Sequence, residues 1–177
     1  MKHDLRTSLL YPAAAGALYA ALTMLLSPIS YGALQFRLSE VLCVLPFFLP
    51  NTAVGLFLGC ALANTISAAG ILDVVFGSLA TLGAGLCTAA FGRSWRETGK
   101  LPGTGKRLLA VLMPVLWNGL VVGAILSWSF TRDSFWSGFF LMGGQVALGE
   151  CGVMLLGGLP FMALMPRVLR TLTRRQD

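Results

Sequence analysis

Hydrophobic residues are gathered along this chain in long blocks that short polar stretches separate. The four blocks are Leu9 to Ile29, Val41 to Gly92, Leu108 to Thr131 and Ser134 to Pro166. Only two of them contain an ionisable acid, Asp73 in the second and Glu150 in the fourth. An α-helix crosses a bilayer with about 20 apolar residues. The second block is therefore too long for a single crossing, and we expect it to fold back on itself.

The basic residues set the number of crossings. Most of the thirteen Lys and Arg side chains fall in three clusters, within residues 2–6, 93–107 and 167–175. The positive-inside rule places all three clusters in the cytoplasm, so an even number of helices must separate each cluster from the next. The sequence therefore predicts six membrane-spanning helices with both termini in the cytoplasm, at approximately 9–29, 33–50, 52–70, 71–92, 108–131 and 134–166.

Composition supports a membrane location. Hydrophobic residues make up 56% of the chain and charged residues only 11%, against about 25% charged residues in a soluble domain. We interpret residues 1–177 as one all-α integral membrane domain in contact with the lipid bilayer, with no nucleic-acid partner. The first segment lacks a clear cleavage site and leads directly into further apolar sequence, so we expect no removable signal peptide.

Several kinds of chemistry find no support in the sequence. The single histidine is His3, and the four cysteines stand alone without the C-x-x-C spacing of a zinc or redox site. The PGTGKR stretch at 102–107 resembles a phosphate loop, but Arg107 stands where that motif needs Ser or Thr. We therefore expect no metal, no cofactor and no enzyme activity, and we expect any ATP hydrolysis to occur in another subunit.

Polar residues inside the apolar blocks are the candidates for chemistry. Arg37 and Glu40 are three positions apart, which places them on one face if this segment is helical. They form either a mutual surface salt bridge or a gate at the outer mouth of a site. The other candidates are Asn64, Asp73, Asn118, Gln145 and Glu150.

Glu150 is the most deeply placed of these charges. An ionised carboxylate in hydrocarbon costs several kcal/mol, so this side chain must face a cavity, a ligand or a partner charge such as Arg37. For Asn64, Asn118 and Gln145, a hydrogen bond between helices is an equally good interpretation.

Small residues mark close helix contacts. Gly55 and Gly59 in the third predicted helix, and Gly119 and Gly123 in the fifth, follow the spacing that lets two helices approach closely. The first helix has a flat face of Ala13, Gly16, Ala17 and Ala20. Such a face serves either internal packing or docking to a partner in the membrane.

Two longer stretches resemble a known family. They are ISYG at 29–32 with QFR at 35–37, SE at 39–40 and VLP at 44–46, and then GILDVVFGSLAT at 70–81. Both are similar to segments of the QueT family, the substrate-binding S components of energy-coupling factor (ECF) transporters for queuosine precursors. The resemblance covers nearly the whole chain.

The resemblance implies a transport subunit in the bacterial plasma membrane, with several membrane crossings. Such a subunit binds a 7-deazaguanine outside, as preQ0, preQ1 or queuine, and releases it inside when coupled to a transmembrane coupling subunit and two ATPases. The family class uses an alanine-rich first helix for this coupling. In this chain the matching positions are Ala13, Gly16, Ala17 and Ala20.

The cargo's chemistry suggests roles for the polar residues. The ring N–H and exocyclic amine of a 7-deazaguanine lie side by side, and a carboxylate accepts both. We expect Glu150 to read this edge with help from Asn118 and Gln145, and Arg37 and Glu40 to shape the outer mouth. Asp73 and Asn64 are further polar candidates. Aromatic rings that stack on the base are expected among Trp117, Tyr31 and Phe36.

Two other functions remain open at this stage. One is an S component for a different vitamin-like solute, such as riboflavin, thiamine or a pterin. The other is a stand-alone membrane carrier or adaptor that works without ATPase subunits.

Overall fold

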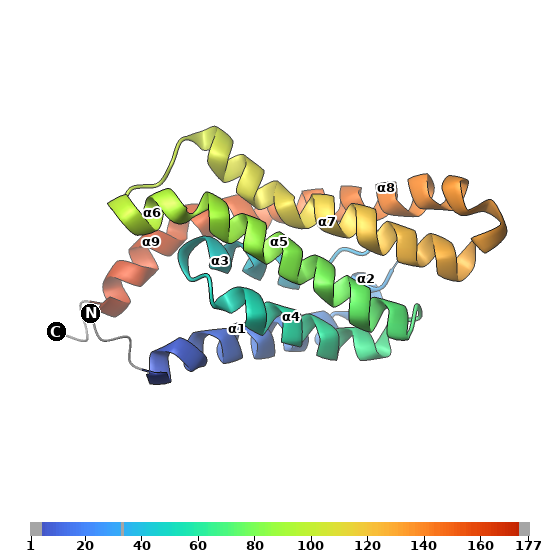
Figure 1. Cartoon of the computed structure of the whole chain (residues 1–177), viewed down its shortest axis with the longest axis horizontal. Coiled ribbons are helices and arrows are strands. Elements are labelled where there is room, and N and C mark those ends of the chain that lie inside the picture. The colour runs from blue at the N-terminus through green and yellow to red at the C-terminus, as the bar shows by residue number, and fades with distance from the viewer. Residues whose placement is uncertain (1–4, 33, 174–177) are drawn as a thin grey trace.

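The computed structural model describes residues 5–32 and 34–173, which form an elongated bundle of helices (Figure 1). No strand occurs in this part of the chain, so the predicted all-α fold class is confirmed. The longer helices are α1 (Leu5–Leu25), α4 (Thr52–Ala63), α5 (Ser78–Phe91), α7 (Thr104–Phe130), α8 (Phe135–Val153) and α9 (Leu159–Thr173).

Shorter elements connect the longer helices. Three lie before α4. They are α2 (Ser27–Ser30), η1 (Leu38–Val44) and α3 (Leu45–Phe48), and α3 continues directly from η1. The π-helical turn η3 (Asp73–Gly77) leads into α5, and a second π-helical turn, η5 (Met154–Gly158), joins α8 to α9. The remaining elements are η2 (Asn64–Ile66), α6 (Arg93–Thr98) and η4 (Arg132–Ser134).

Three helical stretches have the length and composition to cross a membrane, namely Asp73–Phe91, Thr104–Phe130 and Arg132–Thr171. Three shorter apolar helical stretches, Leu9–Leu25, Leu38–Phe48 and Thr52–Ile66, precede them. Within the described residues these six stretches follow the order of the six predicted segments.

The second of these stretches differs most from its prediction. Helical structure was expected from residue 33, but it begins at Leu38. Arg37 has an extended backbone, and the N–H of Phe36 donates to the carbonyl of Ile29, so the chain turns back here. Gln35 has a positive φ of 44°, a conformation that a helix cannot contain. The apolar run continues through this turn, so hydropathy alone did not reveal it.

The distribution of apolar and polar side chains is the reverse of that in a soluble protein. Large apolar side chains such as Leu148 and Phe140 are exposed on the outside, whereas Glu40, Asp73 and Asn64 are fully buried. Lipid is as apolar as a leucine side chain, so an apolar exterior is stable only in a membrane. The interior is where polar groups find partners.

Glycines allow two pairs of helices to approach closely. A methyl group on Gly16 of α1 would lie 2.3 Å from the carbonyl oxygen of Gly55 on α4, and one on Gly59 would lie 2.2 Å from the carbonyl oxygen of Gly16. A methyl group on Gly123 of α7 would come within 2.5 Å of Gly143 on α8. The stripes on α4 and α7 therefore serve contacts inside the bundle.

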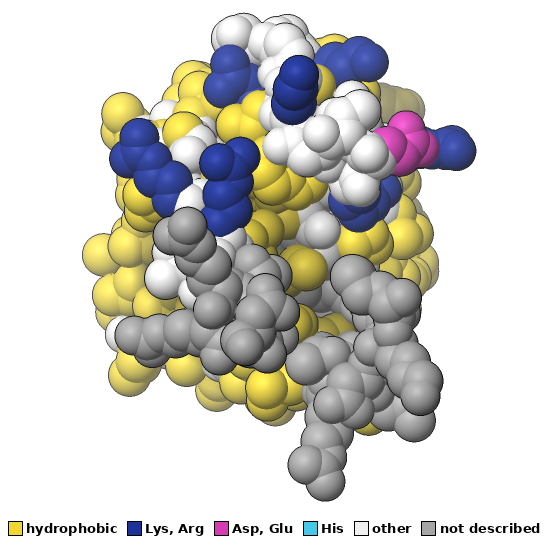
Figure 2. Space-filling view, turned by 90° about the vertical axis from the view of Figure 1, so that its left-hand side faces the viewer, with side chains coloured by type: hydrophobic (Ala, Val, Ile, Leu, Met, Phe, Trp, Pro, Cys, Tyr) yellow, Lys and Arg dark blue, Asp and Glu magenta, His cyan; other side chains and the backbone are white. Residues whose placement is uncertain are grey.

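Charge distinguishes the two ends of the bundle. Lys and Arg side chains gather on the end of the bundle that holds α6, the start of α1 and the end of α9 (Figures 1 and 2). The exposed basic residues of α6, the α6–α7 connection, the first turn of α7 and α9 include Arg93, Arg96, Lys100, Lys106, Arg167 and Arg170. The opposite end holds α2, the α4–α5 connection and the α7–α8 turn (Figure 1).

Candidate functional site

Four charged side chains lie in the interior of the described bundle. Arg37 and Glu150 are 4% and 3% exposed, and Glu40 and Asp73 are 0% exposed. Glu40 lies in η1, Asp73 in η3 and Glu150 in α8, and Arg37 directly precedes η1. A charge without a partner is costly in such surroundings. Their partners therefore define the site.

Glu40 is held by two donors from different elements. The hydroxyl of Tyr19 on α1 donates to Glu40 Oε1, and the thiol of Cys43 donates to Glu40 Oε2 at 3.0 Å. Each carboxyl oxygen thus has a partner, and the side chain is fixed in place. Glu40 lies deep in the bundle instead of at the outer surface, where the sequence analysis placed it.

Glu150 on α8 reaches Glu40 from across the bundle interior. Its Oε1 accepts a hydrogen bond from Asn118 Nδ2 at 2.8 Å, which joins α8 to α7. Its carboxyl group also interacts with that of Glu40. Two acidic groups from distant parts of the sequence therefore meet, together with an amide that donates to one of them.

Arg37 pairs with Asp73 and not with Glu40. Its Nη2 is 3.5 Å from Asp73 Oδ2, its Nε donates to the carbonyl of Ser30 at 3.4 Å, and its guanidinium stands over the ring of Tyr31 at 5.1 Å. Of the two interpretations of Arg37 and Glu40 drawn from the sequence, the mutual surface salt bridge does not form: both side chains are buried, and Arg37 pairs with Asp73. The backbone at Arg37 is extended, so the helical three-residue spacing does not apply.

Asp73 is tied to α4 and to the connection that follows it. Ser67 Oγ donates to Asp73 Oδ2 at 2.6 Å, and Asn64 Nδ2 donates to the Asp73 carbonyl at 2.9 Å. Asp73 opens the π-helical turn η3, and such turns are common at functional sites.

Cys60 connects the two parts of the interior. Its sulfur accepts from Thr81 at 3.2 Å, from Asn64 at 3.5 Å and from Tyr19 at 3.6 Å. One connected set results, which we call the buried polar cluster: Tyr19, Arg37, Glu40, Cys43, Cys60, Asn64, Ser67, Asp73, Thr81, Asn118 and Glu150. Five members were not predicted from the sequence, namely Tyr19, Cys43, Cys60, Ser67 and Thr81. Their one signal was a polar atom within an apolar segment.

The buried polar cluster has unused hydrogen-bonding capacity. Among the described residues, the buried side-chain atoms without a hydrogen bond are Ser30 Oγ, Arg37 Nη2, Asn64 Oδ1, Asp73 Oδ1 and Arg107 Nε. All but the last lie in this cluster or beside it. Buried polar atoms are nearly always satisfied, so the cluster has places for polar atoms from a ligand or water.

A cavity of about 260 Å³ opens near the ion pair, at the end of the bundle opposite the basic residues. Tyr31, Gln35 and Ser67 line it on one side, and Phe130, Met142 and Gln145 on the other. Tyr31 also donates to the carbonyl of Ala63 at 2.6 Å, which anchors this wall. Because Tyr31 and Ser67 contact Arg37 and Asp73 respectively, the cavity lies one side chain away from the ion pair.

Not every predicted site residue lies at the buried polar cluster. Trp117 lies on the outside of the bundle, 36% exposed, with its ring against Gly83. Phe36 is half-buried and its ring faces Gly152 of α8. Gln145 lines the cavity wall, whereas the amide that donates to Glu150 is that of Asn118. The structure thus brings together Arg37, Glu40, Asn64, Asp73, Asn118 and Glu150.

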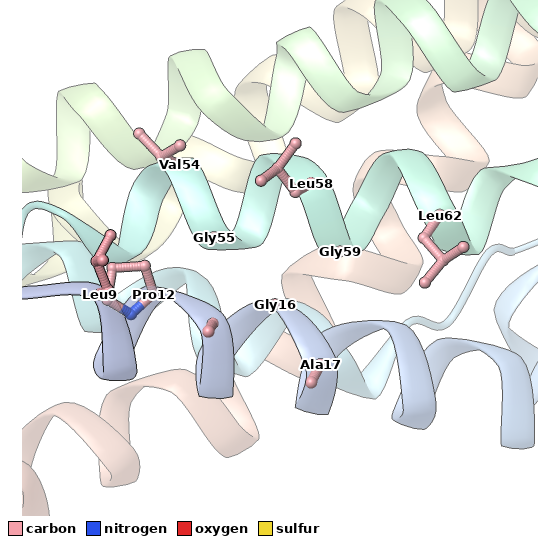
Figure 3. Close-up of a pocket in the computed structure, with 10 residues that line it drawn as sticks. Leu9, Pro12, Gly16, Ala17, Val54, Gly55, Leu58, Gly59 and Leu62 are labelled. Carbon is pink, nitrogen blue, oxygen red and sulfur yellow. The ribbon is translucent and has the colours of Figure 1, made fainter. Parts of the chain in front are cut away.

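The small residues of α1 fall into two groups. Gly16 packs against Gly55 and Gly59 of α4, and Ala20 is buried. Ala13 and Ala17 are exposed and line an apolar groove between α1 and α4, together with Leu58 and Leu62 (Figure 3). The groove has a volume of about 360 Å³.

Comparisons with known proteins agree with one another. Residues 9–167 match the family model described as QueT transporter. A relative named queuosine precursor transporter QueT, from Lactococcus lactis subsp. cremoris (strain MG1363), is 44% identical over 68 residues, which cover 37% of this chain. The match spans 40% of the length of that relative. No solved structure matches the chain. Because the family match extends over most of the sequence, this chain belongs to the QueT transporter family.

Proposed function

We propose that this protein is the substrate-binding subunit of an ECF-type importer and that it captures a queuosine precursor of the 7-deazaguanine class. Family membership and the name of the Lactococcus relative support the cargo class. The observation that carries the proposal is the buried polar cluster, which contains the Asn118–Glu150 pair and also, at Arg37, Asn64 and Asp73, buried polar atoms that lack hydrogen bonds.

The orientation in the bacterial plasma membrane follows from charge. The basic end faces the cytoplasm under the positive-inside rule, with both termini on that side and six crossings between them. The cavity lined by Tyr31 and Gln145 then opens to the outside. Cargo enters there and passes Arg37 and Asp73 before it reaches Glu150.

The cluster offers what a guanine-like base needs. Glu150 accepts from the ring N–H and the exocyclic amine, while Asn118 fixes the orientation of its carboxyl group. Arg37 has an unused N–H for the carbonyl oxygen of the base. Tyr31, on the outer connection, and Phe130 supply aromatic rings to the wall of this cavity, where an entering base would stack on them.

Coupling occurs on another surface of this subunit. The groove between α1 and α4 is apolar, faces outward and is lined by Ala13 and Ala17 (Figure 3). Small side chains allow a helix of the transmembrane coupling subunit to approach closely. Two ATPase subunits attached to that partner supply the energy for release.

The deciding experiment measures binding of 7-cyano-7-deazaguanine, 7-aminomethyl-7-deazaguanine and queuine to the purified protein, with riboflavin and thiamine as controls. We expect binding of at least one deazaguanine and none of the vitamins. Binding of riboflavin or thiamine alone would overturn the cargo assignment.

The variant Glu150→Gln tests the site itself. We expect it to lose about a hundredfold in affinity, because a neutral amide cannot accept both donors of the base edge and a buried charge-assisted hydrogen bond is lost. Glu97→Gln is the matched control, since Glu97 is exposed and pairs only with Arg93 nearby. An unchanged affinity in Glu150→Gln would contradict the assignment.

A further inference from the structure

We propose that Glu40 and Glu150 share a single proton, and that Glu40 takes over this proton when Glu150 binds the donors of the cargo. Glu40 is then a positioning residue, which lets Glu150 become ionised only when a ligand is present. The second step rests on the proposed function, because it assumes that Glu150 reads the base. The shared proton is a property of the protein without cargo.

Close packing of α8 and η5 on the segment around η1 brings the two acids together. A methyl group on Gly149 would lie 2.0 Å from the carbonyl oxygen of Leu34, and one on Gly157 would lie 2.7 Å from Cγ2 of Val41. Each acid is the sequence neighbour of one of these contacts. The two carboxyl groups are hydrogen-bonded to each other. An ionised carboxylate can only accept, so this hydrogen bond requires a proton on one of them.

The charges around the pair lead to the same conclusion. Among the described residues the buried cation is Arg37, and it pairs with Asp73. The polar groups that surround the two acids bring no positive charge; they are Tyr19 of α1, Cys43 of η1, Cys60 of α4 and Asn118 of α7. Two carboxyl groups in contact cannot both be ionised without a large cost, and such pairs hold one proton between them.

The number of donors decides which acid carries the proton before cargo arrives. Glu40 accepts hydrogen bonds from Tyr19 and Cys43, whereas Glu150 accepts one from Asn118. Hydrogen bonds to a carboxylate favour its ionised form. The negative charge therefore resides on Glu40, and the proton resides on Glu150, which donates it to Glu40.

Cargo reverses this assignment. The ring N–H and the exocyclic amine of the base add two donors to Glu150, so its carboxylate becomes the better stabilised of the two. The proton moves along the existing hydrogen bond from a carboxyl oxygen of Glu150 to one of Glu40, and the negative charge moves the opposite way. No proton enters or leaves the protein, and the interior keeps the same net charge when the cargo binds.

Infrared spectroscopy of the purified protein without cargo tests the shared proton. Exposed acids are ionised at neutral pH, so a carbonyl band of a protonated carboxylic acid, recognised by its shift in D2O, reports a buried one. We expect this band in the wild-type protein. Glu150→Gln should remove it, and Glu40→Gln should shift or remove it, because an amide replaces the carboxylate partner. Asp133→Asn, which changes an exposed acid in η4, is the matched control and should keep the band.

The absence of the band from the wild-type protein, or a band that either Glu variant leaves unchanged, would overturn the proposal. Labelling the glutamates with carbon-13 gives the same answer if the variants do not fold. The label should shift the band, because Glu97 is exposed and the pair supplies the buried glutamates. A band that the label does not shift would come from another residue, such as Asp73, and would contradict the proposal.

A second measurement adds 7-aminomethyl-7-deazaguanine or 7-cyano-7-deazaguanine to the wild-type protein. Bound cargo should shift the infrared band without removing it, and calorimetry in buffers of different ionisation enthalpy should detect almost no exchange of protons with the solvent. Release of about one proton per bound cargo, or an unchanged band, would overturn the transfer to Glu40. If neither ligand nor queuine binds, the proposed function fails, whereas the spectrum without cargo still decides the shared proton.

Discussion

At the basic end of the bundle, Phe47 and Phe48 pack edge to face at 5.0 Å between ring centroids, and Met162 and Met165 complete an apolar core with Val44 and Val111. From the middle of the bundle to the opposite end, the interior consists of acids, amides, hydroxyls and thiols instead. Two elements, η1 and α7, contribute to both regions: Val44 and Val111 belong to the apolar core, and Glu40 and Asn118 to the polar cluster. One bundle therefore contains an apolar end and a polar end.

The difference separates stability from binding. Among the described residues, the core around Phe47 consists of apolar side chains, and the one buried atom without a hydrogen bond toward the basic end is Arg107 Nε. This core therefore offers no polar partner to a cargo. The polar end has several such atoms and a cavity beside them. We therefore expect substitutions at the basic end to change the free energy of unfolding, and substitutions at the other end to change affinity as well.

The largest effect on stability is expected at the apolar end. Phe47→Ala should lower the free energy of unfolding by about 3–5 kcal/mol, because it empties the centre of a packed core. Denaturant titration in detergent measures this change. The folded fraction should bind cargo with wild-type affinity, and a loss of affinity as large as that in Glu150→Gln would contradict the separation of the two ends.

Removing one hydroxyl at the polar end should have a smaller effect on stability but a visible one on binding. Tyr19→Phe leaves Glu40 Oε1 without its donor and should cost about 1–3 kcal/mol of stability. Cargo affinity should fall as well, because Glu40 is then free to move against Glu150.

Thr88→Val is the matched control for Tyr19→Phe. It removes a hydrogen bond of 3.1 Å from the Thr88 hydroxyl to the carbonyl of Ala110, beside the apolar core. It should cost about 1 kcal/mol of stability and leave affinity unchanged. Equal changes in affinity for both variants would mean that the hydrogen bond from Tyr19 to Glu40 does not contribute to cargo binding.

The smallest effect on the isolated subunit is expected on the outer surface. Ala17→Leu partly fills the groove between α1 and α4 and should change stability by less than about 0.5 kcal/mol, with cargo affinity unchanged. Co-purification with the coupling subunit and the ATPases should decrease. Ala21→Leu makes the same change on the exposed surface of α1 outside this groove, so it should assemble normally. If Ala17→Leu assembles normally, the groove is not part of the interface with the coupling subunit.

Composition and spacing were enough to predict the class of the fold and the order of its helices. Each long apolar run needs a helix to satisfy its backbone in lipid, and the glycine pairs of α4 and α7 had the spacing of close helix contacts. The motifs at 29–46 and 70–81 were enough to recognise the family, because a family motif is defined by the order of amino acids along the chain.

Only the tertiary structure decided which polar residues meet. Arg37 and Glu40 are neighbours in sequence, yet an extended backbone turns them apart, and Arg37 joins Asp73 from a distant helix. Glu40 and Glu150 are far apart along the chain but share one interior. Hydropathy records how apolar a segment is and not which face of its helix points inward, so the partners of a buried charge depend on how the helices pack.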